Sequence, residues 1–393
     1  MRNSERMGRL RECLNENRWD ALVCALPSNV LLISGYWPII GTGVAVVSSE
    51  GEVSLIAPED ERELARHSWA NRVQFFQPGS LDRITTAAEA ICGPLAQLLG
   101  GTARIGYEAQ AVSEPASYIA MNLYGGGMRG LLAEASPHAA LESADDALAR
   151  LRSVKTPFEV DAIRTACGIA HTAFQTGVKQ MAAGVTEVKS AAAFNEPLAC
   201  AGLSEAGVTR AGGHVSCISG VHSGNAYGAF ARSTSKPIQA GDLVLTHCNS
   251  QANGYWTDIT RTYAIGGVSD RQREMYSALF AARDAALQAI APGVAASDVD
   301  GAARHVLDTL GFGARFKHST GHGVGFGAID ANALPRIHPK SPGRLEEGMV
   351  FNIEPGIYFE DYGGMRHCDM VALTARGAEL LTPFQSHIED LAI

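Results

Sequence analysis

Three short segments of the chain carry carboxylate or imidazole side chains that could do chemistry, and the candidate residues are Asp258, His322 and Glu354. The segments read YWTDITRT (255–262), GHGVG (321–325) and NIEPG (352–356). Carboxylate oxygens and imidazole nitrogens are ligands that suit zinc, manganese, iron or cobalt, and the same groups act as general acids and bases. The three segments therefore indicate metal-assisted or acid–base chemistry.

Taken together, these segments resemble those of the pita-bread enzymes: aminopeptidase P, Xaa-Pro dipeptidase, methionine aminopeptidase and the metal-free creatinase. The resemblance covers essentially the whole chain and is strongest over about 242–375. It implies that Asp258, His322 and Glu354 meet in one pocket, where the metallopeptidases hold two divalent metals with five ligands. It also implies a creatinase-like α/β N-terminal domain and a pita-bread C-terminal domain, in which helices back a curved antiparallel sheet.

Two of the five ligand positions implied by the resemblance hold other residue types. His247 in GDLVLTH (241–247) stands in place of an Asp, and Cys368 in GMRHCDM (364–370) stands in place of a Glu. Alternation along a strand places Arg366, Cys368 and Met370 on one face, so Cys368 rather than His367 should face the pocket. Each residue alone would be read as a core histidine or an inert buried thiol. Because both occupy ligand positions, we favour a joint change of chemistry.

The loss of two carboxylates argues against a pair of metals, since adjacent cations need bridging negative charge. One divalent metal remains possible, with zinc or iron favoured by the softer sulfur over manganese or cobalt. A site without metal is the open alternative, for which creatinase is the precedent. The ligands of a single ion would come from five residues: His247, Asp258, His322, Glu354 and Cys368.

The surroundings of the implied pocket also differ from the peptidase pattern. Ile329 lies seven residues beyond His322, where peptidases carry a His that stabilises the tetrahedral intermediate. A second peptidase His aligns with Tyr227 or Phe230, and His222 is nearby but shifted; it is either a displaced acid–base group or a solvated loop residue. Without such groups, hydrolysis of proline peptides loses proton transfer and oxyanion support, each typically worth about 10²-fold or more.

The resemblance also suggests roles in catalysis and substrate binding. Glu354 would transfer protons beside His322 and His222, and Arg366 would bind an anionic group of the substrate. Tyr255 offers a ring on which a substrate could stack. Trp37 corresponds to a loop that reaches the partner's pocket in dimeric relatives, so we expect a homodimer.

The pattern of elements predicts two domains, 1–153 and 154–393. An amphipathic stretch over 4–18 and apolar runs over 21–26 and 43–47 predict an α/β domain at the start of the chain. Thr156 and Glu159 form a capping-box pattern that opens a helix over about 157–181.

The second half should combine two more helices with strands. Ser269 and Gln272 predict a helix over about 271–290, and a further helix should begin at Ser297 and end at Gly311. Strands are expected at 244–247, 255–263, 350–354 and 366–373. This order predicts a sheet backed by helices.

Composition excludes several classes of protein. A formal charge of -9 and a pI near 5.7 argue against nucleic acid as a partner, because phosphate binding needs clustered Lys and Arg. No apolar run suits a signal peptide or a membrane span, and the eight cysteines show no paired spacing. We therefore expect a cytoplasmic protein with free thiols that does not bind membranes.

These observations predict a hydrolase that cleaves a C–N bond in a small amide, amidine or X-Pro-like substrate, at a site with at most one metal. One alternative is a non-hydrolytic lyase of the same fold, which product analysis would distinguish. The other is a catalytically inactive pseudo-peptidase that binds peptides. Clustered titratable side chains such as His247, Cys368 and Glu354 weigh against that second alternative.

Overall fold

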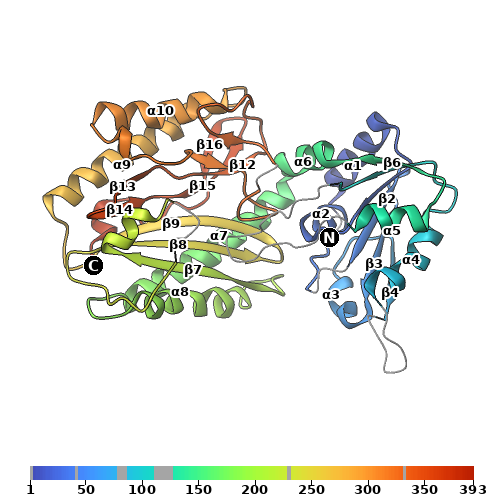
Figure 1. The fold of residues 1–393 in the computed structure, drawn as a ribbon, viewed down its shortest axis with the longest axis horizontal. Helices are drawn as coiled ribbons and strands as arrows, with labels where there is room; N and C mark the ends of the chain where they lie inside the picture. The colour runs from blue at the N-terminus through green and yellow to red at the C-terminus, as the bar shows by residue number, and fades with distance from the viewer. Residues whose placement is uncertain (1–2, 40–42, 78–85, 110–126, 228–231, 331–332) are drawn as a thin grey trace. The chain divides into compact units, whose positions relative to one another are not determined.

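A computed structural model describes residues 3–39, 43–77, 86–109, 127–227, 232–330 and 333–393. The described chain forms two compact units, one ending at Arg152 and the other beginning at Ser153. Each unit has its own sheet and helices (Figure 1).

The N-terminal unit is built on a six-stranded sheet in the order β4-β3-β2-β1-β5-β6. β1 pairs antiparallel with β2 and parallel with β5, so the sheet is mixed. Its core contains Val23, Val46 and Ile105, against which Leu95 packs. The strands are β1 Ala21–Cys24, β2 Val44–Ser48, β3 Val53–Pro58, β4 Arg72–Phe76, β5 Arg104–Tyr107 and β6 Ala140–Ser143. The helices are α1 Ser4–Asn17, α2 Pro27–Ser34, α3 Arg62–Ala65, α4 Ala87–Leu98, α5 Met128–Ala135 and α6 Asp145–Ser153.

The C-terminal unit places its sheets between two pairs of helices (Figure 1). α7 and α8 pack on the antiparallel sheet β7-β8-β9, and α9 and α10 cover the strands on the other side. The helices are α7 Pro157–Gly177, α8 Glu187–Gly202, α9 Asp270–Ala289 and α10 Ala296–Thr309. The long strands are β7 Ala211–Ser219, β8 Leu243–Ala252 and β9 Tyr255–Ala264. The shorter strands are β10 Gly321–His322, β11 Arg336–Ile337, β12 Val350–Ile353, β13 Gly356–Phe359, β14 Gly363–Arg366, β15 Asp369–Thr374 and β16 Gly377–Leu380.

This architecture confirms the predicted fold class, and local sequence signals account for several element boundaries. The capping boxes of Thr156 with Glu159 and of Ser269 with Gln272 open α7 and α9. The prediction that Ser297 caps the next helix is wrong, since α10 begins at Ala296. The N–H of Ala296 donates to the carbonyl of Gly343, so a distant backbone group does the work of the expected side-chain cap.

The strand predicted over 366–373 is interrupted, which corrects that prediction. β14 ends at Arg366, opposite Gly356, and β15 begins at Asp369, opposite Ile353. The facing segment leaves β12 after Ile353 and enters β13 at Gly356, and Pro355 between them has no N–H to continue a ladder. Cys368 instead forms an isolated antiparallel bridge with Thr260 of β9.

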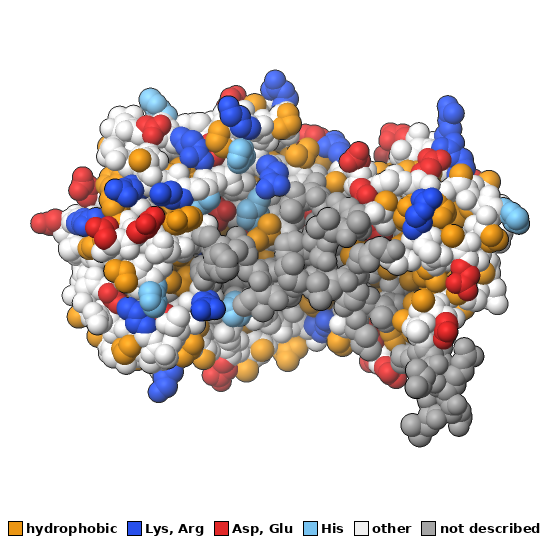
Figure 2. Space-filling model, viewed as in Figure 1, with side chains coloured by type: hydrophobic (Ala, Val, Ile, Leu, Met, Phe, Trp, Pro, Cys, Tyr) orange, Lys and Arg blue, Asp and Glu red, His pale blue; other side chains and the backbone are white. Residues whose placement is uncertain are grey.

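Acidic and basic side chains are interspersed over the coloured part of the face drawn in Figure 2, which shows no continuous basic patch. None of the helices in the described ranges is long and apolar enough to cross a membrane.

Candidate active site

The hairpin of β8 and β9 brings two candidate residues to one face. Asn253 and Gly254 at its turn both have positive φ, 50° and 87°, as a two-residue turn between antiparallel strands requires. The resulting register places His247 opposite Thr260, two residues from Asp258 on the same face of β9. The residues of this turn therefore fix the register of the hairpin, and the register brings His247 and Asp258 together.

His322 and Glu354 come from a crossing of β10 with the end of β12. The Asn352 amide oxygen accepts from the His322 N–H at 2.7 Å, and the Glu354 N–H donates to the carbonyl of Thr320 at 2.7 Å. The approach is so close that a Cβ at Gly321 would lie 1.9 Å from the Asn352 carbonyl oxygen. Only glycine fits before His322.

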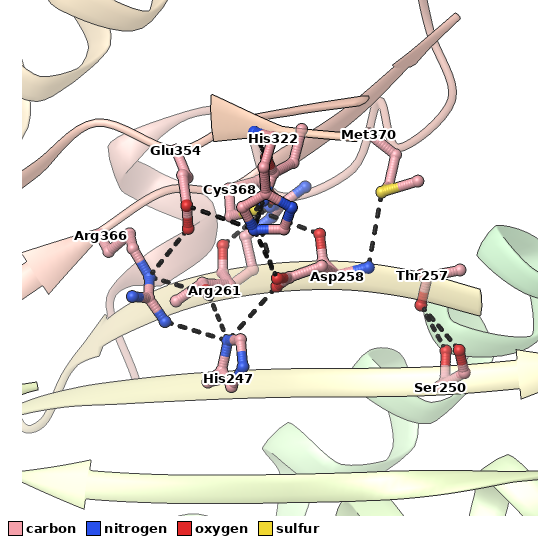
Figure 3. Close-up of polar contacts among 12 residues, drawn as sticks. His247, Ser250, Thr257, Asp258, Arg261, His322, Glu354, Arg366, Cys368 and Met370 are labelled. Atoms are coloured by element: carbon pink, nitrogen blue, oxygen red, sulfur yellow. Dashed lines mark hydrogen bonds and ion pairs between the residues drawn. The ribbon is translucent and has the colours of Figure 1, made fainter. Parts of the chain in front are cut away.

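Asp258, His322 and Glu354 converge as the resemblance implied (Figure 3). Their ligand atoms lie within 4.8 Å of one another. The Nε2 of His322 is 3.5 Å from Asp258 Oδ2 and 3.7 Å from Glu354 Oε1. Two carboxylates and one imidazole nitrogen around a common point are a donor set for a divalent cation.

The orientation of His322 also fits a cation. Its Nδ1 lies 3.0 Å from the Gly323 carbonyl and donates to it, which turns Nε2 toward the carboxylates. The Asn352 Nδ2 lies 3.2 Å from Nε2 and can donate to it when that nitrogen carries no proton. Burial alone would lower the pKa of His322, but Asp258 and Glu354 raise it to about 9. A proton and a cation therefore compete for one place.

His247 lies beside this group but is bonded to other partners. Its Nδ1 is 3.0 Å from Arg366 Nη2 and 3.0 Å from Thr260 Oγ1, whereas Asp258 Oδ1 is 3.5 Å away. Burial lowers the pKa of His247 to about 4; Asp258 opposes the shift and Arg366 adds to it. The imidazole is therefore neutral at neutral pH.

Cys368 faces the pocket, as strand alternation predicted, but its thiol is bonded within the protein. Its Sγ donates to the Asp258 carbonyl at 3.1 Å and accepts from Asn352 Nδ2 at 3.4 Å. Burial and the charges of Asp258 and Glu354 raise the pKa of Cys368 well above its usual value. The ligand roles predicted for His247 and Cys368 stay predictions, and these contacts speak against them.

Arg366 and Glu354 complete the buried cluster. Arg366 Nε donates to Thr260 Oγ1 at 3.2 Å and lies 3.8 Å from Glu354 Oε2. Burial raises the pKa of Glu354 to about 7, against the opposing charges of Arg366 and His322. A carboxyl that changes protonation near neutral pH is suited to both accepting and returning a proton.

The other predicted site residues lie away from this cluster or are untested. His222 contacts Glu187, with Nδ1 3.2 Å from Oε1, and its side chain is 43% exposed. Tyr255 is buried at the start of β9, its ring 5.6 Å from that of Phe326. Trp37 lies half-buried after α2 in the N-terminal unit. Their predicted roles stay predictions.

Of the positions aligned with the peptidase histidines, Ile329 is half-buried and Tyr227 is exposed, with its ring 5.5 Å from that of Tyr358. Phe230 lies outside the described residues.

Sequence reasoning overlooked three polar contributors: Thr260, His318 and Asn352. His318 Nε2 lies 2.8 Å from the Tyr358 hydroxyl, and its Nδ1 donates to the Ser319 carbonyl at 2.8 Å. Burial, with the nearby charge of Arg366, lowers the pKa of His318 to about 3. The sequence did offer signals for these residues. His318 lies four residues before His322, and Thr260 and Asn352 belong to the motifs that carry Asp258 and Glu354.

A buried ionic network lies behind the pocket. Asp369 Oδ1 accepts from Arg261 Nη2 at 2.7 Å, and Asp369 Oδ2 accepts from Arg283 Nε at 2.5 Å. Arg261 also donates to the carbonyl of Cys368 at 2.8 Å. Burial opposes ionisation of Asp369, but the arginines hold its pKa well below the usual range.

His367, 1% exposed, adds a pH dependence to this network. Burial and Arg261 lower its pKa to about 4, below the roughly 6.5 of an unfolded histidine. As the pH falls, the unfolded chain therefore takes up a proton at His367 before the folded chain does. Above about pH 6.5 this histidine does not lower the free energy of unfolding, and below that pH the free energy of unfolding falls as the pH approaches 4. We expect the free energy of unfolding of His367→Phe to fall by about 2 kcal/mol less than that of the wild type between pH 7 and pH 5.

Urea unfolding at the two pH values measures this difference, with the exposed His305→Phe as the matched control. Equal losses in wild type and His367→Phe would contradict the assignment.

The chain is similar to known peptidases, in agreement with the carboxylate and imidazole groups that meet in the site. Residues 161–375 match the model of metallopeptidase family M24, and residues 6–154 match the creatinase/prolidase N-terminal domain. An Xaa-Pro dipeptidase of Pyrococcus furiosus is 32% identical over 380 residues, covering 96% of this chain and 97% of the relative. An Xaa-Pro dipeptidase of Lactobacillus helveticus is 35% identical over 245 residues, 62% of this chain and 64% of the relative.

Solved structures extend the likeness to the whole fold. The prolidase from Pyrococcus horikoshii superposes with a TM-score of 0.76 at 28% identity, over 96% of this chain and 98% of the other. The prolidase from Pyrococcus furiosus gives 0.75 at 30% identity, over 95% and 99%. The chain therefore belongs to metallopeptidase family M24, as a hydrolase related to the Xaa-Pro peptidases.

Proposed function

We propose that the protein hydrolyses a C–N bond in a small amide, amidine or X-Pro-like substrate. The observation that carries the proposal is the buried convergence of Asp258, His322 and Glu354 beside Arg366. X-Pro dipeptides are the first substrates to test, because the relatives are named Xaa-Pro dipeptidases.

The proposed site holds at most one divalent metal, zinc or iron before manganese or cobalt, bound by Asp258, His322 and Glu354. When bound, such an ion supplies Lewis-acid activation of water and of the scissile carbonyl or amidine. Glu354 takes a proton from water and returns it to the leaving nitrogen. Arg366 contributes fixed positive charge for an anionic group.

Several further assignments belong to the same proposal. The domains are 1–153 and 154–393, a division supported by the compact units and the ranges matched. The protein is a homodimer, and Trp37 of one copy approaches the other's pocket. Tyr255 binds the substrate by stacking, and His222, held by Glu187, is an outlying acid–base group.

The proposal is tested by metal analysis and turnover of the same preparation. We expect no more than one divalent ion per chain and hydrolysis of at least one member of a panel of X-Pro dipeptides, small amides and amidines. Mass spectrometry of the products separates addition of water from elimination, which would identify a lyase. Two ions per chain in the wild type would overturn the metal count.

A variant pair sharpens the test of the metal count. The double variant His247→Asp with Cys368→Glu restores two carboxylates, and we expect it to bind a second ion. His247→Asp with Cys200→Glu is the control, because Cys200 is exposed. If the wild type turns over no member of the panel with any of the four metals, a peptide-binding protein becomes the better description.

A further inference from the structure

In the hydrogen bond between Arg366 and His247, the chemistry of the two groups alone decides which is the donor and which is the acceptor. Arg366 Nη2 lies 3.0 Å from His247 Nδ1 (Figure 3). A guanidinium carries five N–H donors and no acceptor, so Arg366 can only donate. The Nδ1 of His247 must therefore be the acceptor, which means that it carries no hydrogen.

The alternative tautomer fits the same atoms poorly. A hydrogen on Nδ1 would lie too far from Asp258 Oδ1, since 3.5 Å is beyond the 2.7–3.2 Å range typical of N–H···O bonds, and only Thr260 Oγ1, at 3.0 Å, could accept it. Such a hydrogen would point against the N–H of Arg366, 3.0 Å away. Thr260 Oγ1 accepts from Arg366 Nε at 3.2 Å and lies 3.0 Å from Nδ1, so its own hydrogen is available to the same nitrogen. Arg366 can only donate to Nδ1, and Thr260 can donate to it as well.

His322 shows the opposite arrangement a few ångströms away. Its Nδ1 donates to the Gly323 carbonyl, and its Nε2 turns to Asp258 and Glu354. A ligating histidine needs its free nitrogen toward the cation and its N–H on a second acceptor. His322 meets this requirement, because its Nε2 faces two carboxylates besides the neutral Asn352 amide, whereas the Nδ1 of His247 faces the guanidinium of Arg366, whose positive charge repels a cation.

We propose that Arg366 is a positioning residue that fixes His247 as the neutral imidazole with its hydrogen on Nε2. His247 then does not act as a cation ligand. The part that concerns the cation rests on the proposed function: any ion is held by Asp258, His322 and Glu354 without His247. The tautomer itself does not depend on metal or turnover.

The tautomer is read directly from ¹⁵N NMR of protein labelled at histidine, with His247→Gln identifying the signals by their loss. We expect a protonated Nε2 and an unprotonated Nδ1 in the wild type. Arg366→Met removes the guanidinium donors and leaves Thr260 Oγ1 able to accept from Nδ1, so it should shift the ring toward the Nδ1–H form, while Arg366→Lys, which keeps a charged donor, should retain the wild-type form. A protonated Nδ1 in the wild type overturns the proposal, even if the variants fail to fold.

Cobalt binding by calorimetry and absorption tests the consequence for the cation. We expect His247→Gln to keep the wild-type spectrum and to bind Co²⁺ within about 3-fold of the wild type, whereas His322→Gln should bind at least about 10²-fold more weakly. Equal weakening in both variants would overturn the assignment. The expected tautomer in a protein that hydrolyses nothing would reject the proposed function alone, and hydrolysis with the other tautomer would reject this inference alone.

Discussion

A Glu354→Gln variant is expected to lose about 10³-fold of kcat/KM on whichever panel substrate the wild type hydrolyses. General acid–base groups contribute typically about 10²–10⁴-fold, and an amide cannot take up the proton that the carboxylate accepts. The same exchange also removes one of the two carboxylates that face His322. Steady-state kinetics with saturating metal isolates the loss of proton transfer from the loss of metal.

The matched control is Glu347→Gln, an exposed carboxylate shortly before β12. It should retain wild-type kcat/KM. If Glu354→Gln keeps more than about a tenth of the wild-type value at saturating metal, another group transfers the proton and the role given to Glu354 is wrong.

An Asp369→Asn variant is expected to lower the free energy of unfolding by about 3–5 kcal/mol. The exchange leaves the buried guanidiniums of Arg261 and Arg283 without their shared counter-charge. Removing one partner of a buried ionic network lowers the free energy of unfolding by far more than the intact network raises it, because the remaining charges stay buried without a counter-charge. Denaturant unfolding at pH 7 measures the difference.

Asp284→Asn is the matched control, because Asp284 also pairs with Arg283, at 3.0 Å, but is 55% exposed. Solvent screens this pair, and its loss should cost less than about 1 kcal/mol. Similar costs for the two variants would mean that burial does not set the strength of the network.

The parts of the fold that could be predicted are those decided by neighbours in sequence. A capping box joins residues three apart, so Thr156 with Glu159 and Ser269 with Gln272 were readable without the structure. Alternation was enough to orient Cys368 toward the pocket, since the bridge to Thr260 preserves the two-residue period across the interruption. The start of α10 was not readable, because its N-terminal partner is Gly343, far along the chain.

The residues of the site likewise fall into those that the sequence could predict and those that it could not. Motifs sufficed to gather Asp258, His322 and Glu354, because each motif carries its own turn or crossing. The partner of His247 could not be read from the sequence, since Arg366 lies 119 positions away and meets it only across β8, β9 and β14. Residue type shows what His247 can do, whereas the hydrogen bond selects which nitrogen does it.

The short interval between Arg366 and Asp369 has an evolutionary consequence. His367 and Cys368 connect the β13–β14 hairpin to the β12-β15-β16 sheet. The side chain of Cys368 points into the pocket, whereas those of His367 and Asp369 point to the opposite side. Deleting or inserting a single residue here would exchange the two sides at once, sending a carboxylate forward and a thiol into the arginines. Descendants of this chain can therefore vary these positions by substitution, but hardly by a change in length.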